Sequence, residues 1–160
     1  MKIGVVADTH SREVPESLWE DFKSVDLIIH AGDFCSLKDY EKFKKEKVLK
    51  AVFGNMDDDH LRKLLPESMI FECDSIRFGL YHGEGPAKRV LEFAQEKFGK
   101  EKVDVVIFGH SHIAVNQTIA GVLYLNPGSP NDIISATQCT YGIIEIKNRK
   151  ISAKITNLKV

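Results

Sequence analysis

The stretch "DVVIFGHSH" (Asp104 to His112) joins a short apolar run to a glycine and two histidines. A near-continuous apolar run between polar flanks is typical of a strand that is buried on both faces, as in a parallel sheet. Three earlier runs have the same form and also end in polar residues: "KIGVVAD" (2–8), "DLIIHAGD" (26–33) and "VLKAVFGN" (48–55). Together these runs predict the buried centre of an α/β fold.

Amphipathic stretches lie between these strands and predict helices over 15–24, 38–46, 58–65 and 86–98. Pro66 would end the third helix, and Pro86 lies where the first turn of a helix accepts proline. Three segments hold two strand-like runs around a turn, at Asp74-Ser75, Ala120-Gly121 and Asn148-Arg149. The order of elements predicts one α/β domain, residues 1–160, with more than one sheet.

The composition is that of an ordinary globular chain of 160 residues with a formal net charge of −1. This balance gives no electrostatic attraction for nucleic acid or for an anionic membrane surface. Three widely spaced cysteines without a C-x-x-C pair indicate reduced thiols, and we expect a cytoplasmic protein. The N-terminus begins directly in a strand, and no apolar run approaches the ~18 residues of a membrane span.

The ends of five predicted strands deliver an aspartate, an asparagine or a histidine. Ligands of open α/β sheets bind at the carboxyl ends of the strands. Imidazole, amide and carboxylate groups together suit divalent ions such as Mn²⁺, Fe²⁺, Zn²⁺, Ni²⁺ and Mg²⁺. Seven residues are therefore candidate metal ligands: Asp8, His10, Asp33, Asn55, His82, His110 and His112.

Seven ligands exceed what one ion can hold, because a first-row ion takes about four to six and leaves some positions open. Two ions ~3.5–4 Å apart can share the set, with one carboxylate between them. Residues i and i+2 of an ideal strand lie on one face, so D-x-H and H-x-H could each grip one ion. The turn could equally divide each pair between two ions, and the spacing leaves both arrangements open.

The charge of such a centre favours an anionic substrate. Two divalent ions outweigh two aspartates and a bridging hydroxide, so the centre stays net positive. A small phosphate ester suits this charge, and the ions would also favour ionisation of a bound water.

The blocks D-x-H, G-D, G-N, H-G and G-H-x-H occur in this order and resemble those of the calcineurin-like metallophosphoesterase superfamily. The short length and the stretch "LNPGSP" (Leu125 to Pro130) are similar to the small phosphodiesterases of the YfcE/MJ0936 type. The resemblance implies a four-layer α-β-β-α sandwich with two mixed β-sheets. It also implies hydrolysis of phosphodiester or phosphomonoester bonds by in-line attack of a metal-bound hydroxide.

The same resemblance implies how two ions would divide the ligands. Asp33 would bridge the ions and act in catalysis through the hydroxide, and Asn55 would act in catalysis and bind substrate. Mn²⁺ is the expected ion, with Ni²⁺, Fe²⁺, Zn²⁺ and Mg²⁺ as alternatives. One ion would take Asp8, His10, Asp33 and His112, and the other would take Asp33, Asn55, His82 and His110.

Two positions depart from the family pattern. Many members have a histidine after G-N that can protonate the leaving group, whereas this chain has Met56, whose thioether donates no proton. We therefore expect slow hydrolysis of esters with poor leaving groups and faster hydrolysis of activated aryl esters. Relatives often read H-G-H where this chain has His82-Gly83-Glu84, and Glu84 would bind a metal weakly or face water.

Two further residues have roles that the sequence leaves open. The stretch Asn126-Pro127-Gly128-Ser129 predicts a turn. The resemblance implies that this turn lies near the metals, where Ser129 would bind a phosphate oxygen of the substrate or orient a ligand. His30 would support the ligands from behind or pack within its strand.

Two other classes of function stay open. A scaffold like the retromer subunit Vps29 would act through protein contacts, but such a module is free to lose ligands, and this chain keeps all seven. A nuclease would need a basic patch, which the sequence lacks. Diesters are favoured over monoesters because they carry a single charge and no arginine is closer in sequence to a metal block than Arg12. An exposed hairpin edge near the C-terminus would allow a homo-oligomer.

Overall fold

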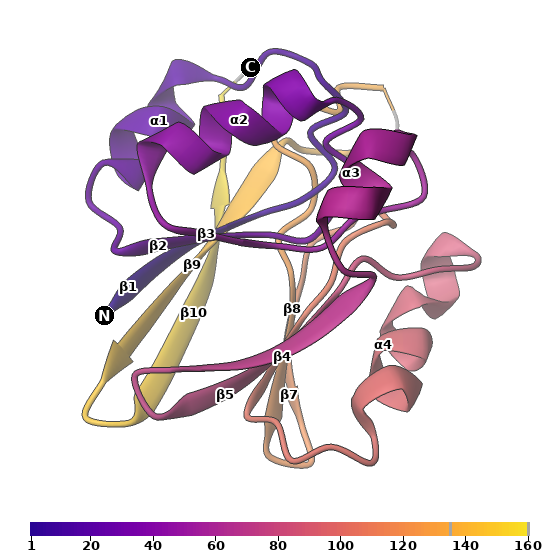
Figure 1. The fold of residues 1–160 in the computed structure, drawn as a ribbon. Helices are drawn as coiled ribbons and strands as arrows, with labels where there is room; N and C mark the ends of the chain where they lie inside the picture. The colour runs from indigo at the N-terminus through magenta and orange to yellow at the C-terminus, as the bar shows by residue number, and fades with distance from the viewer. Residues whose placement is uncertain (135, 160) are drawn as a thin grey trace.

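The computed structural model describes residues 1–134 and 136–159, in which strands and helices alternate over residues 2–73 (Figure 1). The strands are β1 (Lys2–Val6), β2 (Leu27–His30), β3 (Leu49–Ala51), β4 (Ser68–Cys73), β5 (Ile76–Tyr81), β6 (Val105–Ile107), β7 (Val115–Ile119), β8 (Val122–Asn126), β9 (Thr140–Lys147) and β10 (Lys150–Asn157). The helices are α1 (Glu16–Phe22), α2 (Leu37–Glu46), α3 (Asp59–Leu64), the short 3-10 helix η1 (Ala87–Arg89) and α4 (Val90–Phe98).

The strands form two five-stranded sheets, and each combines a parallel centre with antiparallel hairpins. The first sheet has the order β10-β9-β1-β2-β3, and its strands β1, β2 and β3 run parallel. The second has the order β4-β5-β6-β8-β7, and its strands β5, β6 and β8 run parallel. Both sheets are mixed, as the sequence analysis predicts, and the parallel strands of each sheet end at a common edge.

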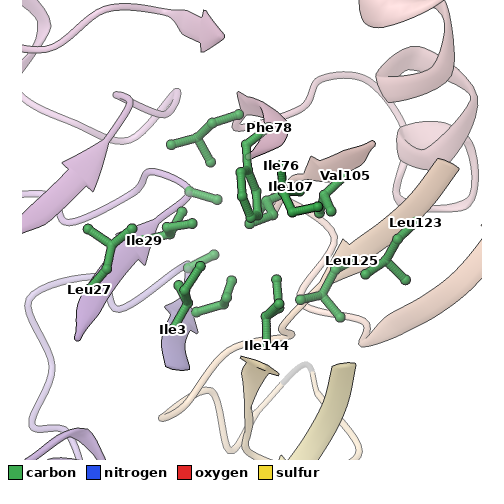
Figure 2. Close-up of a cluster of buried hydrophobic side chains, with 14 of the residues drawn as sticks. Ile3, Leu27, Ile29, Ile76, Phe78, Val105, Ile107, Leu123, Leu125 and Ile144 are labelled. Carbon is green, nitrogen blue, oxygen red and sulfur yellow. The ribbon is translucent and has the colours of Figure 1, made fainter. Parts of the chain in front are cut away.

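Apolar side chains fill the space between the two sheets (Figure 2). Ile3 and Ile29 come from the first sheet and Phe78, Ile107 and Leu125 from the second, and all five are fully buried. Because both parallel centres are also covered on their outer faces, their strands are apolar on both sides, which explains the near-continuous apolar runs.

Helices cover the two outer faces. Leu18 of α1, Phe43 of α2 and Leu61 of α3 are fully buried in a cluster against the first sheet. Val90 and Ala94 of α4 are buried in a separate cluster against the second sheet. The result is the four-layer α-β-β-α arrangement that was expected (Figure 1).

All three predicted hairpin turns are confirmed. The central residues of each turn have positive φ: Asp74 (52°) with Ser75 (60°), Ala120 (49°) with Gly121 (83°), and Asn148 (50°) with Arg149 (62°). Positive φ at both central residues defines a type I′ turn, whose twist matches that of the adjoining strands.

Several elements are shorter than predicted. Strand β2 ends at His30 and β3 at Ala51, although the apolar runs continue to Asp33 and Asn55. These last residues leave the hydrogen-bonded ladder, and Asp33 has a φ of 60°. The predicted helix 86–98 begins with η1 before it becomes α-helical. In the described part of the chain, no helix is both long and apolar enough to cross a membrane.

Candidate metal centre

The seven predicted ligands all follow strands of the two parallel centres. Four come from the first sheet, after β1, β2 and β3, and three come from the second, after β5 and β6. Since the two sheets face each other, the ends of these strands bring both sets to one end of the sandwich. In chain order they are Asp8 and His10, then Asp33, Asn55 and His82, and finally His110 and His112.

Asp8 lies at the middle of this cluster and is completely buried. Its Oδ1 is 3.6 Å from Nε2 of His112, 3.9 Å from Nε2 of His82 and 4.0 Å from Nε2 of His10. The backbone N–H of His110 donates a hydrogen bond to the same carboxylate at 3.0 Å. A residue of the first sheet is therefore in contact with ligands from both sheets.

Asp33 and Asn55 complete the cluster on the side of β2 and β3. The Asp33 Oδ2 atom is 3.3 Å from Nε2 of His82 and 3.9 Å from Nε2 of His10. The Asn55 Oδ1 atom is 3.1 Å from Nε2 of His82 and 2.9 Å from Nδ1 of His110. The structure thus brings all seven side chains together, while their role as ligands stays a prediction.

Two overlapping triads have ligand atoms that all lie within 4.8 Å of one another: Asp8 with His10 and His112, and Asp8 with Asp33 and His82. Nitrogen and oxygen donors at this spacing fit divalent ions. Asp8 is the residue common to both triads. Asp33, which the family resemblance makes the bridging ligand, also reaches His10 of the other triad.

The electrostatics of the cluster favour a cation. Burial raises the pKa of Asp8 to about 6, although His82 and His112 partly offset this effect. Burial alone would lower the pKa of His82, but its hydrogen bond with Asp33 and the charges of both aspartates raise it to about 9. A proton on His82 therefore balances the buried carboxylates, and a divalent ion would supply that positive charge in its place.

Each of the four histidines predicted as ligands places its second ring nitrogen against a protein atom. Such contacts fix the ring orientation and the tautomer of a metal-binding histidine. The four contacts are His82 Nδ1 with the Ala31 carbonyl (2.7 Å), His110 Nε2 with the Gly85 carbonyl (2.9 Å), His10 Nδ1 with the Cys35 thiol (3.3 Å), and His112 Nδ1 with the Asp132 carboxylate.

Asp57 organises two of the ligand loops, and the sequence analysis did not identify it. Its carboxylate accepts hydrogen bonds from the backbone N–H groups of Asp33 (3.0 Å), Cys35 (2.7 Å) and Gly54 (2.7 Å). These bonds join the loop after β2 to the loop after β3. Its position two residues after Asn55 is the only sequence signal that could have pointed to it.

The loop after β8 supports the cluster from behind. The Ser129 hydroxyl has no exposed area and donates to the backbone carbonyl of Asp8 at 2.8 Å. Asp132 of the same loop holds the ring of His112. Of the two roles expected for Ser129, this geometry fits the orientation of a ligand, because a buried hydroxyl offers no surface to a phosphate.

His30 both supports a ligand loop and packs within the core. Its Nδ1 accepts a hydrogen bond from the Gly32 N–H at 3.2 Å, and its Nε2 lies 3.1 Å from the Thr9 hydroxyl. Its ring stacks on Phe34 at 3.5 Å between centroids. Burial lowers the pKa of His30 well below its ordinary value, so the ring is neutral.

The two departures from the family pattern lie at the rim of the cluster. The Met56 side chain is exposed, while its backbone N–H donates to Oδ1 of Asp33 at 2.7 Å. Glu84 is exposed and accepts a hydrogen bond from the Tyr81 hydroxyl. Burial, together with Glu84, raises the pKa of Tyr81 to about 12.

An arginine lies closer to the cluster than the sequence indicates. Arg62 of α3 donates from Nη2 to the Asn55 carbonyl at 2.6 Å, whereas Arg12 lies 3.6 Å from Asp132. Arg62 therefore accompanies a metal block in the folded chain although it is distant from it in sequence, because α3 turns back over the loop that precedes it.

Arg62, Asn55 and His82 line a hollow of about 160 Å³ beside the cluster. A larger hollow of about 660 Å³ lies among the hairpin turns, beside Ser75 and Gly121, and holds none of the seven predicted ligands.

Comparisons with known proteins agree with the geometry. Residues 1–149 match the calcineurin-like phosphoesterase superfamily domain. A probable metallophosphoesterase from Methanothermobacter thermautotrophicus is 34% identical, over 97% of this chain and 91% of its own. The phosphodiesterase MJ0936 from Methanocaldococcus jannaschii is 31% identical, over 94% of this chain and 96% of its own.

Solved structures have the same fold. A structure of an archaeal phosphodiesterase aligns with a TM-score of 0.75 at 27% identity and covers 98% of this chain and 100% of its own. Vps29 from Chaetomium thermophilum aligns with a TM-score of 0.81 at 16% identity, over 99% and 97% of the two chains, a likeness that shows the fold alone. The chain belongs to the calcineurin-like phosphoesterase superfamily and is a metal-dependent phosphoesterase.

Proposed function

We propose that this protein hydrolyses small phosphodiesters at a centre of two divalent ions. The observation that carries the proposal is the pair of adjoining triads, which together hold five of the predicted ligands and draw them from both sheets. One ion would take Asp8, His10, Asp33 and His112, and the other would take Asp33, Asn55, His82 and His110. Mn²⁺ is our first choice of ion, since carboxylate, amide and imidazole donors all suit it.

Bound ions would lower the pKa of a water that attacks phosphorus in line and would stabilise the negative charge that develops on the phosphate. The protein side chains hold this chemistry in place. Because the Asn55 Oδ1 atom faces His82 and His110, its exposed amide NH₂ group is left to donate to a phosphate oxygen. Asn55 would thus bind both an ion and the substrate.

Protonation of the leaving group is the step that the side chains at the rim of the cluster support least. Met56 occupies the position next to Asn55 and carries no exchangeable proton. Glu84, the other candidate at the rim, is hydrogen-bonded to Tyr81. We infer that esters with good leaving groups react fastest, because they need no general acid.

Diesters are our first choice of substrate, and the names of the curated relative MJ0936 and of a similar archaeal structure, both phosphodiesterases, support this choice. The charge argument for diesters is weaker than the sequence indicated, since Arg62 lies beside Asn55. The scaffold alternative has no supporting observation here, because the likeness to Vps29 extends to the fold alone.

The experiment that tests the proposal is hydrolysis of bis(p-nitrophenyl) phosphate by protein stripped with chelator. Mn²⁺, Ni²⁺, Zn²⁺ and Mg²⁺ are added back separately to wild type and to Asp33→Ala, with Asp59→Ala as a matched control on the exposed side of α3. We expect at least one ion to restore turnover. Asp33→Ala should lose about 1000-fold, since each ~1.4 kcal/mol of lost transition-state stabilisation is tenfold.

The control should change turnover by no more than about twofold, because exposed residues away from the cluster contribute little. If wild type binds two ions per chain and no ion restores turnover on diesters or on p-nitrophenyl phosphate, the proposed activity is wrong. The scaffold alternative would then be preferred.

A further inference from the structure

Arg62 binds the backbone of the loop that carries Asn55. Its Nη2 donates to the Asn55 carbonyl at 2.6 Å, and its Nε donates to the Asp57 carbonyl at 2.9 Å. The guanidinium carbon also lies 5.3 Å from the centroid of the Phe53 ring. One planar group therefore contacts three residues of a single short loop, and this fork geometry is specific to arginine.

This loop carries the predicted ligand Asn55 and also contacts the predicted ligand Asp33. Asn55 directs its Oδ1 between His82 and His110, and the Met56 N–H donates to Asp33. Asp57 fixes the inner side of the loop through its three backbone contacts. The outer side is exposed at Asn55 and Met56, so packing does not hold it there, and Arg62 supplies the contact.

Asn55 is the ligand most sensitive to such support. Its amide oxygen is neutral, so it gains less from attraction to a cation than the carboxylates do, and its contribution depends on where the oxygen lies. The histidines of the cluster have their own supporting contacts at the second ring nitrogen. For the Asn55 backbone, the hydrogen bond from Arg62 of α3 provides this support.

We propose that Arg62 is a positioning residue that holds Asn55 in place for the second ion, the one shared by Asn55, His82 and His110. The inference rests on the proposed dinuclear centre. It predicts that loss of the Arg62 guanidinium lowers the affinity for this second ion. The affinity for the other ion, which His10 and His112 would bind, should stay almost unchanged. A residue that merely joins α3 to the body of the protein would affect both ions equally or neither.

The test is calorimetric titration of chelator-stripped protein with Mn²⁺, which reports binding without any need for turnover. The variants are Arg62→Gln and Arg62→Lys. The control is Arg89→Gln in η1, because Arg89 also lies over a ring, that of Phe93 at 5.0 Å, and is also exposed. Melting temperatures of the metal-free proteins show whether each variant is folded.

We expect Arg62→Gln to weaken one of two Mn²⁺ sites about 10- to 100-fold, as loss of outer contacts to metal ligands commonly does, and to leave the other within about threefold. Arg62→Lys should weaken the same site by a smaller factor, since lysine offers a point charge without the fork. The control should match wild type at both sites.

Two results would overturn the inference while the dinuclear centre stands: unchanged affinities in both Arg62 variants, or equal weakening of both sites. Should Arg62→Gln not fold, Arg62→Lys decides, and wild-type affinity at both sites overturns the inference. Fewer than two Mn²⁺ ions in wild type would overturn the dinuclear centre as well, so the two failures are distinguishable.

Discussion

The two ends of the sandwich share an unusual backbone conformation and use it differently. At the hairpin end, Asp74 and Asn148 have φ values of 52° and 50° in type I′ turns. At the end that carries the metal cluster, Asp8, Asp33 and His110 have φ values of 57°, 60° and 69°. Positive φ is uncommon in residues other than glycine. Because such residues gather at both ends of the sandwich, the cause at each end has to be identified separately.

The difference between the ends lies in what stabilises the conformation. In a type I′ turn, the two flanking strands hold the turn, and Asn and Asp tolerate the left-handed region. Histidine at such a φ persists only when its surroundings impose it. At the metal end, the supports come from distant parts of the chain, including the Ser129 hydroxyl on Asp8 and the Asp57 carboxylate on Asp33. The left-handed conformation at the metal end therefore positions the side chains of the site. At the hairpin end, the same conformation reverses the chain direction between two strands.

After the loss of turnover expected for Asp33→Ala, the largest effect that we predict at the metal end follows Met56→His, which restores a proton donor beside Asn55. For esters with poor leaving groups, the rate should rise by about 10- to 100-fold, within the range that general acid catalysis usually gives. For p-nitrophenyl esters it should change little, because that leaving group departs without protonation. Steady-state rates across a series of aryl and alkyl esters measure this, and equal gains for all esters would contradict the account.

An effect of similar size, on metal affinity, is expected from Asp132→Asn, which removes the charge that holds His112. We predict a 10- to 100-fold loss of affinity for one Mn²⁺ ion, as for other supports of metal-binding histidines, measured by calorimetric titration. Asp104→Asn is the control at the hairpin end, where Asp104 also accepts a backbone N–H bond, from Arg77 at 2.8 Å. If both variants lower metal affinity to the same extent, the claim that only the metal end supports ion binding is contradicted.

The stability of the metal-free protein should depend on pH through His82. Its folded-state pKa of about 9 lies above the ordinary value of 6.5, so its stabilising contribution is complete below about pH 6.5 and is lost as pH rises through 9. We expect a loss of about 1–3 kcal/mol over this window, seen as a fall in melting temperature in the presence of chelator.

His82→Asn should flatten this dependence on pH, while His60→Asn, at an exposed histidine of α3, should retain it. A wild-type melting temperature that rises between pH 6.5 and 9 would show that a different group controls the stability of the cluster.

The smallest effect is expected at the hairpin end. Ala120 has a φ of 49° and is exposed at a turn, so Ala120→Asn should stabilise the fold by about 0.5–1 kcal/mol. Chemical denaturation measures the gain, and turnover should stay within about 1.5-fold of wild type. A substantial loss of turnover in this variant would show that the two ends are coupled.

The strands and turns could be predicted because their signals are local, whereas the four-layer arrangement was implied by the family resemblance. Buried parallel strands appear as apolar runs, and turns such as Asn148-Arg149 lie between two strand-like segments. The convergence of the seven ligands was also predictable, since parallel strands bring their carboxyl ends to one edge. The apolar pattern placed the ends of β2 and β3 too far along the chain, because apolar residues continue after the hydrogen-bonded ladder stops.

The supports of the site could not be predicted. Asp57, Arg62 and Asp132 act through contacts with loops that come together only in the folded chain. Their residue types are common on protein surfaces, and apart from the position of Asp57 two residues after Asn55, their spacing does not distinguish them from solvated charges. Arg62 illustrates the limit well, because it lies seven residues from Asn55 in sequence and reaches it only through the reversal between β3 and α3.

Anomalous diffraction from crystals grown with Mn²⁺ would test the dinuclear centre most directly. The account predicts two peaks ~3.5–4 Å apart, one beside His10 and His112 and the other beside Asn55, His82 and His110, with a carboxylate between them. A single peak, or peaks remote from these side chains, would contradict it.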